Sequence, residues 1–176
     1  MSDAPEAITR GTVAIGIEHG AIPVNMGTLI RSAALFGADC AFTVGRRYET
    51  QPSAVGFDRH FPVYHYDRVG ELPGAHPEAV LVGVEFDPSA TSLEAFHHPE
   101  KAVYLLGAED SGLSTTAQAV CDRFVTIPAG PHSLNVSVAG SIVLYDRTAK
   151  RARETTPTEN IRWLTGSLAD EGGYDG

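Results

Sequence analysis

The sequence predicts an α/β protein with a mainly parallel sheet and helices on both faces. Short apolar runs alternate with amphipathic or polar segments along the chain, which is the pattern of repeated strand–helix units. Two of these runs, 102–106 and 124–127, end in polar turns that each lead toward a helix. Because α/β proteins bind ligands where parallel strands end, we expect the functional site at these two turns.

Length and composition indicate one globular domain. The chain has 176 residues, of which 43% are hydrophobic and 20% charged, which is ordinary for a protein that buries a core. No apolar run reaches the ~18 residues that span a bilayer, and the acidic stretch 1–11 lacks the features of a signal peptide. We therefore expect a cytoplasmic protein without a membrane partner. Its expected parts are a flexible lead (1–11), one domain (12–154) and a short C-terminal helix with a tail (155–176).

The charge balance restricts the kinds of partner. The formal net charge is −9, which counts against unspecific nucleic-acid binding, because such binding usually requires a basic domain. Basic residues nevertheless gather in two places. The first basic group is Arg46, Arg47 and Arg59, and the second is Arg147, Lys150 and Arg151.

Apolar runs bounded by turn residues predict six strands. They cover residues 13–17, 40–44, 62–66, 79–84, 102–106 and 124–127. The connections are expected to include a loop over 71–78 and helical turns near 53–57 and 92–96.

A long helix is expected after the first strand. Starting from Met26, apolar residues recur at i, i+3, i+4, i+7 and i+8, which is the stripe of an amphipathic helix. Asn25 is a suitable N-cap because its side-chain oxygen can accept from the free N–H groups of the first turn. Gly37 is expected to end the helix in the left-handed conformation.

The last long helix is expected to follow a loop rich in proline and glycine. Ser133 is a candidate N-cap, and the helix is expected to continue to about Glu154. Pro157 breaks it, and a short final helix is expected within 159–168.

Several familiar reaction chemistries lack their sequence signatures. The chain contains no GxxxxGK[ST], GxGxxG, HExxH or GxSxG pattern. Its seven histidines show no metal-ligand spacing, so we expect no metal; His132, however, falls in the loop where we expect the site. Cys40 and Cys121 fit no CxxC pattern, so we expect two buried thiols.

Three polar motifs resemble, in the same order, those of the SpoU/TrmH branch of the SPOUT RNA methyltransferases. The first motif is matched by NMGTLIRSAALFG (25–37), the second by LLGAEDSGLS (105–114) and the third by IPAGPHSLNVSVA (127–139). The likeness covers roughly residues 12–148. Ala129 stands where the family usually has methionine, which alters a packing contact and removes no polar group.

The resemblance implies a fold and an activity that composition and periodicity do not. Family members have a parallel sheet whose C-terminal part threads through a loop to form a deep trefoil knot, and the knotted loops bind S-adenosylmethionine. They are homodimers whose active site lies where two knots meet. The chain is therefore expected to be a minimal, single-domain member that methylates a ribose 2′-hydroxyl of RNA, with tRNA as the expected substrate and rRNA as the alternative.

Two other functions stay open. A non-catalytic RNA-binding or assembly factor on the same fold fits the acidic charge, although the retained Arg31, Ser133 and Asn135 favour an enzyme. A Rossmann-type nucleotide enzyme is disfavoured because no glycine-rich fingerprint follows the first strand.

By resemblance, five residues are expected to carry the reaction: Arg31, Asn25, Glu109, Ser133 and Asn135. Arginine is almost never deprotonated, so we expect Arg31 to orient a phosphate and stabilise the developing alkoxide. Glu109 is expected to hold Arg31 or a loop of the partner subunit, and Ser133 and Asn135 to lie beside the reactive methyl group. The structural alternatives are helix caps for Asn25 and Ser133, and solvated surface roles for Arg31 and Glu109.

Cofactor contacts are expected mainly from main-chain groups at strand ends, because adenine needs an apolar slot with a few main-chain partners. The expected residues are Val84, Glu85, Leu106, Gly107, Ile127 and Leu134. Both basic groups are expected to contact RNA phosphates, and their alternative role is that of solvated faces and caps.

Overall fold

The computed structural model describes residues 2–3, 13–85 and 89–154 of the chain. These residues form an eight-stranded sheet in the order β1-β4-β3-β2-β7-β5-β8-β6, and every strand pair is parallel. The strands are β1 (Ser2–Asp3), β2 (Val13–Glu18), β3 (Cys40–Val44), β4 (Val63–Tyr66), β5 (Val80–Val84), β6 (Thr91–Ser92), β7 (Ala102–Leu106) and β8 (Arg123–Thr126). The α-helices are α1 (Pro23–Leu35), α2 (Leu72–Ala75), α3 (Thr115–Val120) and α4 (Val136–Glu154). Short 3-10 helices are η1 (Pro52–Ala54), η2 (Phe57–Arg59), η3 (Val69–Glu71) and η4 (Leu93–Ala95).

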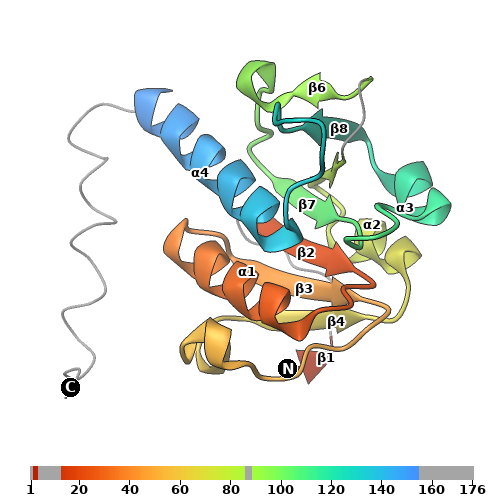
Figure 1. Ribbon diagram of the computed structural model, residues 1–176, viewed down its shortest axis with the longest axis vertical. Helices are drawn as coiled ribbons and strands as arrows, with labels where there is room; N and C mark the ends of the chain where they lie inside the picture. Colours follow the sequence, from red (N-terminus) through yellow and green to blue (C-terminus); the bar gives the residue numbers. More distant parts are fainter. Residues whose placement is uncertain (1, 4–12, 86–88, 155–176) are drawn as a thin grey trace.

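Helices cover both faces of the sheet (Figure 1). Because side chains alternate along a strand, neighbouring residues of β2 enter different cores. Ile15 packs with residues of α1 and α4, whereas Ala14 packs with residues of α2 and α3. The predicted α/β class with a covered parallel sheet is confirmed, and the knot stays a prediction. Over the described ranges, no helix is long and apolar enough to cross a bilayer.

The six predicted strands are present, each within one residue of its expected bounds. The expected loop over 71–78 is wrong in part, because Leu72–Ala75 forms α2 and buries its two end residues against the sheet. In the expected lead 1–11, Ser2 and Asp3 pair with β4. The rest of that lead and the helix expected within 159–168 lie outside the described residues.

Helix α1 begins two residues earlier than the predicted cap. Proline suits the first turn of a helix because it lacks the N–H that would be left unpaired there, and Pro23 occupies that position. Ile22 is the N-cap residue and makes no side-chain capping bond, so the prediction that Asn25 caps this helix is wrong. Asn25 lies inside the first turn and is buried. Gly37 follows the helix with φ of 72°, as predicted.

Helices α1 and α4 pack side by side on one face of the sheet (Figure 1). Gly140 of α4 permits the close approach, because a Cβ at this position would lie 2.5 Å from Cδ1 of Leu29. Farther along, the hydroxyl oxygens of Ser32 and Ser141 lie 2.7 Å apart. The two helices therefore run alongside each other from their N-terminal ends.

A buried histidine lies in the core on the opposite face. His76 follows α2, is 1% exposed, and has its Nε2 3.0 Å from the hydroxyl oxygen of Tyr66. Its Nδ1 is buried without a hydrogen-bond partner among the described residues. Because burial disfavours the charged ring, the pKa of His76 falls from its ordinary 6.5 to about 4.

Acidification should therefore destabilise the fold through His76. Between pH 6.5 and 4 the unfolded chain binds a proton at this ring that the folded chain does not bind. When the pH is lowered from 7 to 5, the free energy of unfolding of the wild type should fall by roughly 2 kcal/mol more than that of a His76→Leu variant. Urea unfolding at both pH values measures the difference, and the same pH dependence in both proteins would contradict the assignment.

Candidate functional site

A cavity of about 300 Å³ lies at the carboxyl ends of β5, β7 and β8. Its walls come from the end of β5, the loop between β7 and α3, the loop between β8 and α4, and the first turns of α4. All three strands run in the same direction, so their following loops meet at one edge of the sheet. The cavity is therefore where the sequence placed the functional site.

Each residue predicted to contact a cofactor lines this cavity. They are Val84, Glu85, Leu106, Gly107, Ile127 and Leu134. Of the residues predicted to be catalytic, Glu109 and Ser133 line it as well, and so does His132. The sequence did not single out Asp110, Ser111 or Thr126, which lie beside predicted positions and also face the cavity.

The loop between β7 and α3 is a tight structure built on two glycines. Ala108 and Gly112 exchange main-chain hydrogen bonds of 3.1 and 2.8 Å, which leaves Glu109 at the tip. Gly107 is required because a Cβ there would lie 2.0 Å from the main-chain carbon of Gly112. Gly112 has φ of 67°, a left-handed conformation that favours glycine.

Three predicted catalytic residues form one hydrogen-bonded group. The side-chain amide of Asn25 donates to Glu109 Oε1. The amide of Asn135 donates to Asn25 Oδ1 at 3.1 Å and to Glu109 Oε1 at 3.2 Å. This triad joins the start of α1, the tip of the β7–α3 loop and the start of α4 beside the cavity.

Asn135 is also the residue that caps α4. Its Oδ1 accepts the Ser137 N–H at 3.0 Å, the Val138 N–H at 3.3 Å and the Ser137 hydroxyl at 2.7 Å. The alternative that Ser133 caps this helix is therefore wrong, because the helix begins at Val136. Ser133 is instead exposed in the cavity wall.

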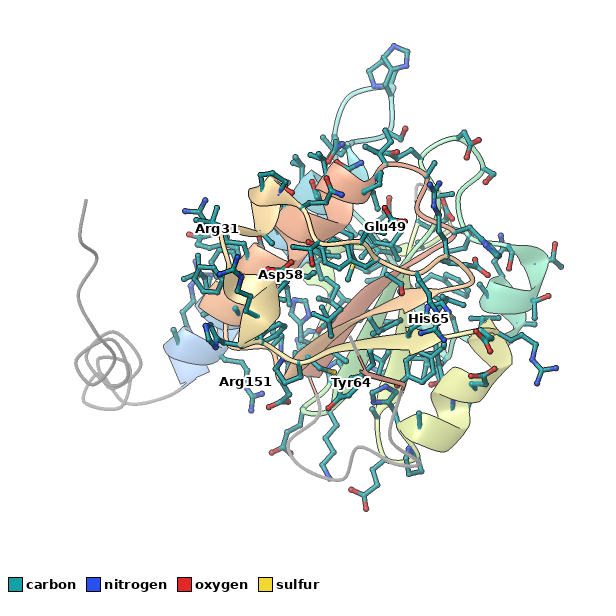
Figure 2. All side chains as sticks on the ribbon, turned by 90° about the horizontal axis from the view of Figure 1, so that it is seen from below. Arg31, Glu49, Asp58, Tyr64, His65 and Arg151 are labelled. Carbon is teal, nitrogen blue, oxygen red and sulfur yellow. The ribbon has the colours of Figure 1, made fainter. Side chains whose placement is uncertain are left out.

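Arg31 lies apart from the cavity of its own chain. It is exposed on α1, and Figure 2 shows its side chain pointing outward from that helix. It makes no hydrogen bond or ion pair with the described part of the chain and does not line the cavity. The structure brings together four of the five predicted catalytic residues and leaves Arg31 on the outer surface.

The first basic group is exposed in the connection between β3 and β4. Arg46, Arg47 and Arg59 all have exposed side chains. Arg46 donates from Nη1 to the main-chain oxygen of Ala21 at 3.0 Å, which joins the loops after β2 and β3. These arginines are accessible to a phosphate, and their contact with RNA stays a prediction.

The second basic group is mostly structural, which corrects the expectation that it forms a phosphate track. Arg147 is 4% exposed and donates to the main-chain oxygens of Pro99 at 2.5 Å and Glu100 at 2.6 Å. Lys150 donates to the oxygens of Leu93 and Phe96 at 2.5 and 3.1 Å. These contacts fix α4 to the segment before β7, and only Arg151 of this group is exposed (Figure 2).

The two cysteines differ from the expectation of two buried thiols only in the partial exposure of Cys121. Cys40 is buried and Cys121 is half-buried, and burial raises the pKa of each thiol to about 12. Within the described ranges, no group of three or more His, Cys, Asp and Glu side chains could hold a metal ion.

A family model described as the SpoU rRNA methylase family matches residues 12–145. An uncharacterized tRNA/rRNA methyltransferase of Mycolicibacterium gilvum is 28% identical over 158 residues, which cover 85% of this chain and 49% of the relative. A 23S rRNA (guanosine-2′-O-)-methyltransferase of Acinetobacter baylyi is 30% identical over 139 residues, 73% of this chain and 56% of the relative. The chain thus spans about half the length of these relatives.

Among solved structures, the SpoU methyltransferase AviRb of Streptomyces viridochromogenes, in complex with AdoMet (S-adenosylmethionine), has a similar fold. The match has a TM-score of 0.72 at 25% identity and covers 83% of this chain and 60% of AviRb.

Replacing Asn135 should separate its capping role from its bridging role. Serine caps a helix about as well as asparagine but lacks the amide that reaches Asn25 and Glu109. We expect the free energy of unfolding of Asn135→Ala to be about 1 kcal/mol lower than that of Asn135→Ser, because only the alanine variant loses the cap. Urea unfolding followed by circular dichroism measures both variants, and equal stability would show that the cap contributes nothing.

Proposed function

Because the chain belongs to the SpoU methylase family, we propose that it transfers a methyl group from S-adenosylmethionine to a ribose 2′-hydroxyl of RNA. The observation that carries this proposal is the cavity at the strand ends with the Asn25–Glu109–Asn135 triad beside it. A non-catalytic RNA-binding factor would not need a cavity of this kind together with an ordered polar triad.

The residues around the cavity suit S-adenosylmethionine. Its volume of about 300 Å³ lies at the lower end of the range for small-molecule sites. Val84, Leu106 and Ile127 offer apolar side chains to an adenine ring. Glu85 and Glu109 add carboxylates to the lining, which complements the net positive charge of a ligand with an ammonium, a sulfonium and one carboxylate. When bound, the cofactor supplies a methyl group on a positively charged sulfur atom that is a good leaving group.

Asn135 has little free hydrogen-bonding capacity, and this separates its task from that of Glu109. Both N–H groups of the Asn135 amide are directed at Asn25 and Glu109, and its oxygen caps α4. Asn135 and Asn25 therefore fix the position of Glu109 at the cavity. Ser133 is exposed in the wall, and its free hydroxyl can bond to a ribose.

A homodimer would explain the position of Arg31. Exposed apolar side chains lie on the outer faces of α1 and α4, and Val24 and Leu35 flank Arg31 in one helical stripe. The stripe continues onto α4 at Val138 and Tyr145, since the ring of Tyr145 packs edge-on against Phe36. Such a contiguous patch marks a protein–protein interface, and a two-fold axis would use the same patch of both chains.

The patch also reaches the cavity. Leu134 is 37% exposed, and it lines the cavity just before α4 begins. A second copy seated on the patch would place its α1, with Arg31, near this mouth. There the guanidinium would hold a substrate phosphate and stabilise negative charge as it develops on the ribose oxygen. Because arginine stays protonated, we assign it no role as an unassisted base.

The proposed RNA is tRNA, with rRNA as the second candidate. The resemblance of this chain to minimal family members supports tRNA, whereas the relative of Acinetobacter baylyi, a 23S rRNA methyltransferase, supports rRNA. We also propose that the C-terminal part of the domain threads through a loop to form a deep trefoil knot, as in the family. The exposed first basic group supports contact with RNA phosphates.

Transfer of tritiated methyl groups from S-adenosylmethionine to total tRNA and rRNA, followed by mapping, tests the activity. Arg31→Ala should slow transfer at least ~100-fold, because a charge-stabilising donor is lost, while the cofactor Kd stays within about twofold. Arg68→Ala is the matched control and should keep the wild-type rate, because Arg68 is highly exposed and, among the described residues, forms an ion pair only with Glu71. If calorimetry shows no binding of S-adenosylmethionine, or if Arg31→Ala keeps the wild-type rate, the proposal is wrong.

Placing a charge in the apolar patch should separate the dimer. Val138→Glu and Tyr145→Glu each bury a carboxylate in the proposed interface, which is unfavourable without a partner. Light scattering after gel filtration should give twice the chain mass of 18.7 kDa for the wild type and the single mass for both variants. Ala119→Glu, at an exposed apolar residue of α3 on the other face of the sheet, should stay dimeric. A wild type that is monomeric would contradict the proposed interface.

A further inference from the structure

The carboxylate of Glu18 binds the loop that follows β7. Glu18 is the last residue of β2 and is only 3% exposed. Its Oε2 accepts the Ser114 N–H at 2.9 Å, and its Oε1 accepts the Ser114 hydroxyl at 2.7 Å. Glu18 forms no ion pair with the part of the chain that the structure describes. The two hydrogen bonds therefore offset the unfavourable burial of the carboxylate.

Ser114 carries this restraint into the next helix. Its hydroxyl oxygen also accepts the Ala117 N–H at 3.0 Å and so caps α3. One serine thus connects the end of β2 to the start of α3. The C-terminal end of the β7–α3 loop is fixed at this point.

Glu85 restrains the same loop from its other side. The sheet order places β2 and β5 on either side of β7, so the residues that follow these strands flank the loop. Glu85, directly after β5, accepts the Leu113 N–H at 2.8 Å. Two consecutive main-chain N–H groups, those of Leu113 and Ser114, are therefore held by carboxylates from opposite neighbours of β7.

The loop restrained in this way forms one wall of the cavity. Residues 107–112 line it, and Glu109 at the tip belongs to the triad. Glu85 lines the cavity as well, whereas Glu18 does not. Any influence of Glu18 on a bound molecule must therefore act through Ser114 and the loop.

We propose that Glu18 is a positioning residue for methyl transfer, which sets the β7–α3 loop in its cofactor-binding conformation through Ser114. The inference rests on the proposed function, because the ligand whose binding reports the loop position is S-adenosylmethionine. The sequence motifs do not include Glu18. The signal that could have identified it is a lone acid at the end of an apolar strand, the same pattern that Glu85 shows after β5.

The test compares two carboxylates at opposite ends of β2. Glu18→Gln keeps the size of the side chain but turns an NH₂ group toward the donors of Ser114. Asp39→Asn is the control, because Asp39 Oδ2 accepts the Val13 N–H at 2.6 Å at the far end of the strand. Calorimetry with S-adenosylmethionine should show a Kd about tenfold higher for Glu18→Gln. The Kd of Asp39→Asn should stay within about twofold of the wild-type value, even where urea unfolding shows that Asp39→Asn and Glu18→Gln lose similar stability.

Variants of Ser114 decide the question independently of any folding defect in Glu18→Gln. Ser114→Thr keeps both groups that bond to Glu18, so it should retain the wild-type affinity for S-adenosylmethionine. Ser114→Ala loses the hydroxyl and should bind S-adenosylmethionine more weakly. In the cofactor-free protein, amide hydrogen exchange at Leu113 and Ser114 should be faster in Glu18→Gln than in Asp39→Asn.

The possible outcomes separate the two proposals. A wild type that binds no S-adenosylmethionine overturns the proposed function itself. If the wild type binds but Glu18→Gln keeps its affinity, or Asp39→Asn weakens binding equally, the positioning role alone is overturned. The same conclusion follows if Ser114→Thr and Ser114→Ala bind alike.

Discussion

The hydrogen bonds among Asn25, Glu109 and Asn135 are the interaction on which the site depends. These residues are separated by 84 and 26 positions, yet their side chains meet beside the cavity. They can meet because every strand pair is parallel, so the segments that follow the strands converge at one edge of the sheet. Close packing of α1 on α4 at Gly140 then brings the starts of both helices together. Displacing any one segment would leave a polar group of the triad without its partner, which costs about 1–3 kcal/mol for a buried group.

The distribution of charge at the site favours a division of labour between cavity and surface. Glu85, Glu109 and Asp110 surround the cavity, so it attracts a cation and repels the phosphates of RNA. In the proposed reaction, a nucleotide would present its ribose to the cavity, and its phosphate would need a cation outside the cavity. Arg31 is such a cation, but its own helix directs it away from the cavity of the same chain. In the proposed two-fold assembly, the same outward direction would place Arg31 beside the cavity of the other chain.

Local patterns predicted the elements well, because apolar runs and turn residues act over a few positions. All six predicted strands are present, and the six residues expected to contact the cofactor line the cavity. Two of the errors arise where a side chain binds a partner far away in the sequence. Asn25 was expected to cap α1, but Glu109 and Asn135 engage its side chain while Pro23 starts the helix. Arg147 and Lys150 were expected to face RNA, but Arg147 is buried and both side chains donate to main-chain oxygens within residues 93–100. No window of sequence contains those partners.

The same reasoning changes the meaning of the acidic composition. A net charge of −9 first counted against an RNA partner, yet several of these carboxylates bond to the main chain inside the fold. At the amino edge of the sheet, the Val13 N–H donates to Asp39 and the Leu81 N–H donates to Asp122. At the carboxyl edge, Glu18 accepts the Ser114 N–H and Glu85 accepts the Leu113 N–H. A carboxylate that accepts a main-chain N–H group forms a charge-assisted hydrogen bond, which is stronger than a hydrogen bond between neutral groups. These four carboxylates therefore fix strand ends and loops, and the net charge alone is a poor guide to partners here.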